Sequence, residues 1–196
     1  MVIYLDTETT GLRPGNICQL SYLMQSGDKV CAKNFFFEVD FVEYGAFCVH
    51  GFSVERLREL SKGKRFCDCI SEIEKDFEKA TYIVCHNTAF DFSFLRKEFE
   101  DCNRFFNSEK GFCTMKNSVG FCKLQRSNHI GYKYPKLSEL LSKLNVSEKE
   151  VLTKTEQLFK EKCGFHDARY DTTAVYMAVN RCGVEPESFI KIKTCL

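Results

Sequence analysis

The chain has 196 residues, of which 44% are hydrophobic, and these values fit one globular domain with a sizeable core. Its formal net charge of +1 excludes a protein that binds polyanions through its overall charge, so a nucleic acid must be held locally or through metal ions. Apolar runs stay well short of the ~18–20 residues that a membrane-spanning helix needs, and we expect no membrane span.

The first segment, residues 2–5, is continuously apolar, which predicts a strand buried on both faces. Asp6 and Glu8 follow where this run ends, and side chains two residues apart on a strand point the same way. Two carboxylates that close repel each other unless a cation lies between them. Mg²⁺ prefers such oxygen ligands, so this segment is a candidate metal site.

The remaining elements follow from apolar spacing and turn residues. After a turn over residues 9–16, the predicted strands cover residues 18–25, 30–39 and 82–85, the first two joined by a hairpin at 26–28. One short helix starts after Ser53 as its N-cap, and further helices are predicted over residues 66–79, 89–101, 137–144, 147–162 and 168–181. This order predicts an α/β fold with a mixed central sheet of about five strands, flanked by helices.

Twelve cysteines are scattered along the chain, with Cys67 and Cys69 as the one close pair and no CxxC, and the chain opens on the predicted strand rather than on a signal peptide. We therefore expect reduced thiols in a cytoplasmic protein, not a disulfide framework or a zinc site. The thiols expected in apolar segments are those of Cys18, Cys31, Cys48, Cys85 and Cys182.

Residues 110–138 contain six lysines and arginines and no acidic residue. Four aromatic rings are interleaved with these cations, at Phe112, Phe121, Tyr132 and Tyr134. Rings beside cations suit a single-stranded nucleic acid, and the alternative is an ordinary solvated loop.

Two further acids lie on helix faces that should pack inward. Asp91 shares a face with Phe94 and Leu95, and Asp171 lies on the apolar stripe of the last helix, formed by Ala168, Val175, Ala178, Val179 and Cys182. A structural role would explain either acid alone, whereas both together with Asp6 and Glu8 indicate a metal cluster. His166 precedes this helix, with Asp167 as the expected N-cap, and a histidine with the ordinary pKa near 6.5 can act as a general base.

Three motifs occur in order: residues 6–11 (Asp-Thr-Glu-Thr-Thr-Gly), 86–91 (His-Asn-Thr-Ala-Phe-Asp) and 166–171 (His-Asp-Ala-Arg-Tyr-Asp). They resemble the three exonuclease motifs of the DEDDh (DnaQ-like) 3′→5′ exonucleases, including the domain of the DNA polymerase III epsilon type. The resemblance implies a ribonuclease H-like fold and one exonuclease domain over residues 1–196. Residues 147–162 depart from compact members of the family, either as an inserted, solvated helix or as a lid that delivers His166.

The resemblance also implies a mechanism. Asp6, Glu8, Asp91 and Asp171 would hold two Mg²⁺ ions, for which Mn²⁺ can substitute, and His166 would be the general base that activates water. The reaction is hydrolysis of the terminal phosphodiester to a nucleoside 5′-monophosphate. By the same resemblance, the 3′-terminal nucleotide would contact Thr9, Thr10, Gly11, Leu12, Val49, His50, Asn87 and Phe90.

The residues leave three functions open. The first is a nuclease for single-stranded or frayed DNA 3′ ends in repair or proofreading, with a DNA polymerase as a candidate partner. The second is an exonuclease that trims RNA, which differs only in contacts to the 2′-OH. The third is a noncatalytic, polymerase-associated subunit that binds nucleic acid. The oligomeric state is not predicted.

Overall fold

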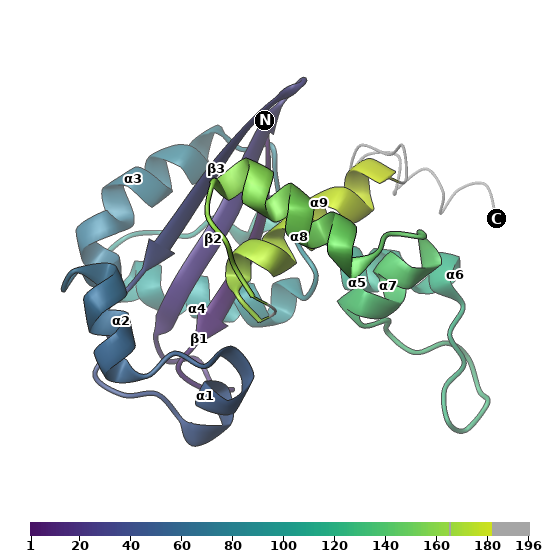
Figure 1. Ribbon diagram of the computed structural model, residues 1–196, viewed down its shortest axis with the longest axis horizontal. Helices are drawn as coiled ribbons and strands as arrows, with labels where there is room; N and C mark the ends of the chain where they lie inside the picture. Colours follow the sequence, from purple (N-terminus) through teal and green to yellow (C-terminus); the bar gives the residue numbers. More distant parts are fainter. Residues whose placement is uncertain (165, 182–196) are drawn as a thin grey trace.

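The protein, described here from a computed structural model for residues 1–164 and 166–181, is built on one five-stranded sheet with the order β3-β2-β1-β4-β5 (Figure 1). The strands are β1 (Val2–Thr9), β2 (Ile17–Ser26), β3 (Lys29–Phe36), β4 (Tyr82–Cys85) and β5 (Gly111–Cys113). β2 pairs antiparallel with both β1 and β3, whereas β4 pairs parallel with β1 and β5. The predicted mixed sheet of about five strands is therefore confirmed.

Helices cover both faces of this sheet. They are α1 (Tyr44–His50), α2 (Val54–Ser61), α3 (Phe66–Lys79), α4 (Thr88–Asp101), α5 (Thr114–Asn117), α6 (Val119–Cys122), α7 (Leu137–Lys143), α8 (Glu148–Phe159) and α9 (Ala168–Arg181), with a 3-10 turn at η1 (Ser108–Lys110). Ser53 caps α2, as predicted, because its side chain accepts a hydrogen bond from the backbone N–H of Arg56 (3.2 Å).

The alternation of side chains along β1 divides the core into two layers. Ile3 and Leu5 pack with Ile73 and Phe94 of α3 and α4 on one face. Tyr4 points to the other face, where its cluster includes Val175 of α9. Asp6 and Glu8 have the same parity as Tyr4, so the sheet directs both carboxylates toward α9.

The basic segment is partly core, which corrects the prediction that it forms a single surface. Residues 111–113 form β5, and Phe112 is buried there beside Val84. Phe121, Tyr132 and Tyr134 remain exposed. A strand as short as β5 carries too few residues to show a periodic pattern.

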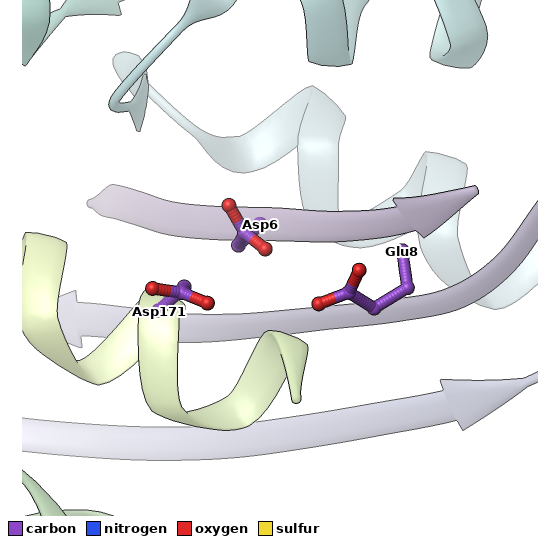
Figure 2. Close-up of side chains that lie close together, drawn as sticks. All are labelled: Asp6, Glu8 and Asp171. Carbon is purple, nitrogen blue, oxygen red and sulfur yellow. The ribbon is translucent and has the colours of Figure 1, made fainter. Parts of the chain in front are cut away.

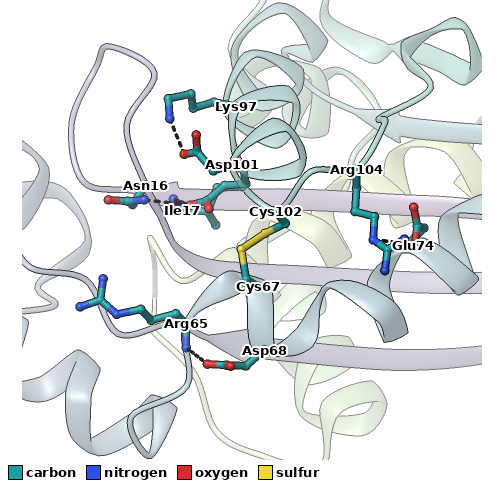
Figure 3. The surroundings of a disulfide bond; sticks show 11 residues. Asn16, Ile17, Arg65, Cys67, Asp68, Glu74, Lys97, Asp101, Cys102 and Arg104 are labelled. Atoms are coloured by element: carbon teal, nitrogen blue, oxygen red, sulfur yellow. Dashed lines mark hydrogen bonds and ion pairs between the residues drawn. A yellow bond between two sulfur atoms is a disulfide. The ribbon is translucent and has the colours of Figure 1, made fainter.

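The expectation that all cysteines are reduced is wrong for one pair. Cys67 at the start of α3 and Cys102 at the end of α4 form a disulfide, with their Cα atoms 5.4 Å apart (Figure 3). The pair is separated by 35 residues, and only the packing of α3 on α4 brings the two thiols together. Cys31 and Cys48 are exposed rather than buried, whereas Cys18 and Cys85 are buried as expected; Cys182 lies outside the described residues.

Within residues 1–164 and 166–181, no helix is both long and apolar enough to cross a membrane.

Candidate metal centre

Three of the four predicted metal ligands converge where β1 faces α9 (Figure 2). Asp6 and Glu8 extend from β1, and Asp171 extends toward them from the first turn of α9. Each residue offers a carboxylate oxygen, and these oxygens all lie within 4.8 Å of one another. The inward position of Asp171 on the stripe of α9 therefore places it beside a strand that is distant in sequence.

The raised pKa values of this cluster show how unfavourable its charges are when no cation compensates them. Burial raises the pKa of Asp6 well above its ordinary value, and the charges of Asp171 and Asp91 raise it further. Burial, followed by the charge of Asp171, raises the pKa of Glu8 to about 9. Burial also raises the pKa of Asp171, against the opposing effect of His166. A divalent cation would offset these penalties, and a set of carboxylate oxygens fits a hard ion such as Mg²⁺.

Asp91 lies beside this cluster but outside the closely spaced group. It is buried at the start of α4, and its Oδ1 accepts a hydrogen bond from the hydroxyl of Thr7 at 3.0 Å. Thr7 stands between Asp6 and Glu8 on β1, so this bond fixes Asp91 against the same strand from its other face. The charge of Asp91 raises the pKa of Asp6, which shows that the two carboxylates interact.

His166 is exposed and has a left-handed backbone conformation (φ 55°) immediately before α9. Its side chain and that of Asp171 line the same cavity of about 610 Å³, together with α7 residues. The structure therefore places the predicted base near Asp171, on an irregular segment.

A buried ion pair that sequence inspection missed holds this segment in place. The guanidinium of Arg169 donates to both carboxylate oxygens of Asp167, from Nε at 2.8 Å and from an Nη atom at 2.7 Å, and both side chains are largely buried. The side-chain amide of Gln19 on β2 donates to Asp167 at 2.9 Å, and its carbonyl accepts from the N–H of Ala168 at 3.1 Å. Arg169 also pairs with Glu161 at 2.6 Å. We call this set, Gln19, Glu161, Asp167 and Arg169, the clamp.

Asp167 also caps α9, as predicted, because its Oδ1 accepts from the backbone N–H of Arg169 at 3.0 Å. Asp167 and Arg169 of the clamp lie between His166 and Asp171 in sequence, and Gln19 bonds this segment to β2 through Asp167 and Ala168. An arginine two residues after an acid gives no signal of pairing in sequence, because this contact depends on burial beside Gln19.

The predicted nucleotide pocket lies in the loop that follows β1. The hydroxyl of Thr9 donates to the carbonyl of Gly11 at 2.9 Å, and that of Thr10 accepts from the N–H of Asn16 at 3.2 Å. A Cβ atom on Gly11 would lie 2.4 Å from the carboxyl group of Glu43, so a larger residue at this position would displace that exposed side chain. Glu43 also donates its backbone N–H to the carbonyl of Thr10 at 2.8 Å.

His50 holds the same loop from α1. Its Nδ1 accepts from the N–H of Phe52 at 3.0 Å, so the ring proton is on Nε2, which donates to the carbonyl of Thr9 at 3.2 Å. Burial lowers the pKa of His50, which favours this neutral form. A structural role for His50 is therefore observed, in addition to its predicted position beside the pocket.

The apolar members of the predicted pocket differ in exposure. Leu12 is 85% exposed and Val49 is 54% exposed, so both are free to contact a ligand. Phe90 is half-buried and packs on Phe94, with ring centroids 4.9 Å apart. Within the described chain, the side chain of Asn87 makes no capping hydrogen bond to α4, although its carbonyl accepts from the N–H of Phe90 (2.8 Å).

A second missed residue, Glu98, supports the loop from α4. Its buried carboxylate accepts from the N–H of Ile17 at 2.8 Å and contacts the side-chain amide of Asn16 at 3.4 Å, beside the disulfide. Figure 3 shows Asn16 and Ile17 next to Cys102. The sequence did contain a signal for Glu98, because this acid lies on the same helix face as Phe94 and Leu95, which packs inward.

The fold and the carboxylate site define a ribonuclease H-like α/β protein, and comparisons with solved structures confirm this architecture. The chain superposes on E. coli exonuclease I in complex with a dA16 oligonucleotide with a TM-score of 0.74 and 16% identity, covering 98% of this chain and 43% of that one. A structure of exonuclease I without ligand gives a TM-score of 0.72 at 15% identity, with coverage of 98% and 44%.

In sequence, the chain is similar to the DNA polymerase III subunit epsilon of Rickettsia felis. The two are 28% identical over 138 residues, which cover 67% of this chain and 57% of the relative. The chain thus spans little more than half of this relative and less than half of the exonuclease I chains. No family model matches the chain. These similarities confirm the predicted resemblance to DnaQ-like exonucleases.

Proposed function

We propose that residues 1–196 form one exonuclease domain that removes nucleotides from the 3′ end of single-stranded or frayed DNA, with divalent metal ions as cofactors. The observation that carries this proposal is the convergence of Asp6, Glu8 and Asp171 from the central strand and the last helix. The similarity to the epsilon subunit and to an exonuclease bound to an oligonucleotide supports the substrate class. A DNA polymerase as partner is supported only by the name of the epsilon relative.

In this proposal, Asp6, Glu8, Asp171 and the adjacent Asp91 hold two Mg²⁺ ions. When bound, such ions lower the pKa of a coordinated water and neutralise the charge that develops on the phosphate. His166 accepts the proton of the attacking water, for which its exposed position near Asp171 is suitable. The clamp orients His166, and Thr7 orients Asp91.

The nucleoside at the 3′ end would occupy the loop after β1. The exposed Leu12 and Val49 offer apolar contact to the terminal base. By the resemblance, the backbone around Thr9, Thr10 and Gly11 would border the sugar. His50 and Glu43 fix this loop, while Phe90 and Asn87 border it from α4.

The test is digestion of 5′-labelled single-stranded DNA and RNA of matched sequence in the presence of Mg²⁺, with EDTA and the Asp171→Asn variant as controls. We expect a ladder that shortens from the 3′ end of DNA and is lost in both controls. Faster shortening of RNA would assign the substrate to the RNA-trimming alternative. Binding of both strands without shortening would overturn the enzymatic proposal and favour a noncatalytic subunit.

A further inference from the structure

The chain between α6 and α7 projects away from the sheet (Figure 1). We call residues 123–136 the arm. An antiparallel bridge between Gln125 and Tyr132 shapes it into a hairpin, and Lys133 donates its N–H to the carbonyl of Leu124 at 2.8 Å. The side chain of Arg126 closes the hairpin by donating to the carbonyl of Tyr132 at 3.0 Å. The arm is therefore an ordered projection rather than an extended loop.

The arm concentrates cations and exposed rings. It contains Lys123, Arg126, Lys133 and Lys136 and no acidic residue. Lys133 pairs with Glu139 at 2.5 Å, whereas the side chains of Lys123 and Lys136 are exposed. Tyr134 is 56% exposed, although burial of an aromatic ring is favourable, and it lines a hollow of about 460 Å³ together with Arg126. A ring beside a guanidinium offers a stacking surface to a base and a charge to a phosphate.

A continuous surface joins the arm to the candidate metal centre. The cavity that contains His166 and Asp171 is also lined by Ser138 and Ser142 of α7. The same two serines line the next hollow, of about 350 Å³, which reaches Leu124 on the arm. The Glu139–Lys133 pair then links α7 to the hollow of Tyr134.

The base of the arm is fixed beside the second motif. His86 Nε2 donates to the carbonyl of Pro135 at 3.0 Å, while its Nδ1 accepts from the hydroxyl of Thr114 at 2.9 Å. Burial lowers the pKa of His86, which favours the neutral ring that makes both bonds. The arm thus has a defined position relative to the strand that precedes Asp91.

We infer that the outer face of α7 and the arm bind the single-stranded part of the substrate that lies 5′ of the terminal nucleotide, without sequence preference. This inference rests on the proposed function, which places the 3′ end at the carboxylates. The phosphates would contact Lys123 and Arg126, and a base would stack on Tyr134. Cations and rings of this kind suit a nucleic acid better than an apolar protein surface.

The test compares a DNA strand of about three nucleotides, too short to reach the arm, with one of about 16 nucleotides. We expect the Arg126→Gln/Tyr134→Ala variant to raise KM about tenfold for the long strand and to leave kcat and the KM of the short strand unchanged. Lys79→Gln/Phe105→Ala is the matched control, because it also removes an exposed cation and a ring that is 80% exposed, from the region of α3 and α4. Thermal unfolding of each variant shows whether it folds as the wild type does.

A second measurement is independent of cleavage: fluorescence anisotropy of the long strand in EDTA, titrated with salt. We expect the Arg126→Gln/Tyr134→Ala variant to bind about tenfold more weakly and with a smaller salt dependence than the control variant. Lys123→Gln tests the charge alone without removing the hydrogen bond of Arg126 to the hairpin. Wild-type binding by both arm variants, or equal weakening in the control, would overturn the inference. Loss of cleavage in the wild type with arm-dependent binding retained would instead refute the proposed function.

Discussion

The pKa of Asp6 shows how strongly a buried carboxylate is affected when no positive charge lies beside it. It lies on the central strand, and burial together with Asp171, Asp91 and Glu8 raises its pKa. In metal-free buffer the folded protein must keep protons on this cluster or bear the repulsion between its charges. The arrangement therefore lowers the stability of the metal-free protein, as expected for the proposed cation site.

We predict that Asp6→Asn raises the metal-free melting temperature by about 2–4 °C, which corresponds to about 1 kcal/mol for a chain of this size. The same variant should lose turnover by about 10³-fold, because several kcal/mol of transition-state stabilisation depend on this ligand. Asp28→Asn, in the exposed turn between β2 and β3, is the control. A lower melting temperature for Asp6→Asn would contradict the crowding of the carboxylates.

His166 is suited to substitution because it is exposed and precedes the helix rather than forming part of it. We predict that His166→Ala lowers kcat by about 10²-fold, as expected for loss of a general base. Calorimetric titration with Mg²⁺ and thermal unfolding should be unchanged, since the carboxylates remain in place. Turnover close to that of the wild type would assign the proton transfer to another group.

At the scale of elements, the sequence predicted regular segments well wherever the apolar pattern was long. The bounds predicted for α3, β4 and α9 agree with the structure. The strand β5 was not predicted, because three residues are too few to show a pattern. The helix α1 was not predicted, because it buries only His50 and has no apolar stripe.

In the candidate site, too, some residues could be predicted from the sequence and others could not. Asp6, Glu8 and Asp171 were recognised because carboxylates stand out at a strand end or on an inward helix face. The clamp and Glu98 were missed, because their partners are neutral or basic side chains and backbone groups brought close only by folding. The Cys67–Cys102 bond was missed for the same reason, since spacing alone does not bring two thiols within reach.

We predict that the Cys67→Ser/Cys102→Ser variant loses about 3–4 kcal/mol of unfolding free energy, from the entropy of the loop that the disulfide closes in the unfolded chain. Urea unfolding measures this loss, and Cys31→Ser, at an exposed free cysteine, is the control. Turnover of the folded variant should be unchanged, because Cys102 lies at the end of α4, whereas Asp91 lies in its first turn. Equal stability of wild type and variant under non-reducing conditions would contradict a stabilising role.

The clamp gives a second prediction at this scale. Arg169→Met leaves Asp167 as a buried charge without its guanidinium, and we expect a loss of about 3–5 kcal/mol in unfolding free energy. The Asp167→Asn/Arg169→Met variant should lose less, which a double-mutant cycle measured in urea would show. Arg56→Met, at an exposed helical pair with Glu59, should change stability little. Strict additivity at the clamp would show that the two residues do not interact.

For the whole molecule, the raised pKa values of the acids predict how stability depends on pH. The metal-free folded protein binds protons on these carboxylates more tightly than the unfolded chain does. The contribution of this proton binding to the free energy of unfolding is therefore fully present below the ordinary acid pKa of about 4. It is lost as the pH rises toward the pKa of Glu8, about 9.

We predict that Mg²⁺ displaces these protons, so that the rise in melting temperature caused by saturating MgCl₂ is larger at pH 8 than at pH 5. Scanning fluorimetry at both pH values, with NaCl of equal ionic strength as the control, measures this difference. Equal shifts at both pH values would indicate that the ion does not bind at the carboxylates.

The carboxylates of the candidate metal centre come from distant parts of the chain, Asp6 from its first strand and Asp171 from the last described helix. During translation, β1 leaves the ribosome long before α9 is made, and the sheet alone cannot close the cluster. A nascent chain therefore cannot assemble this carboxylate cluster until α9 has docked. Under the proposed function, an unfinished chain would therefore lack the metal ligand Asp171 and have no nuclease activity.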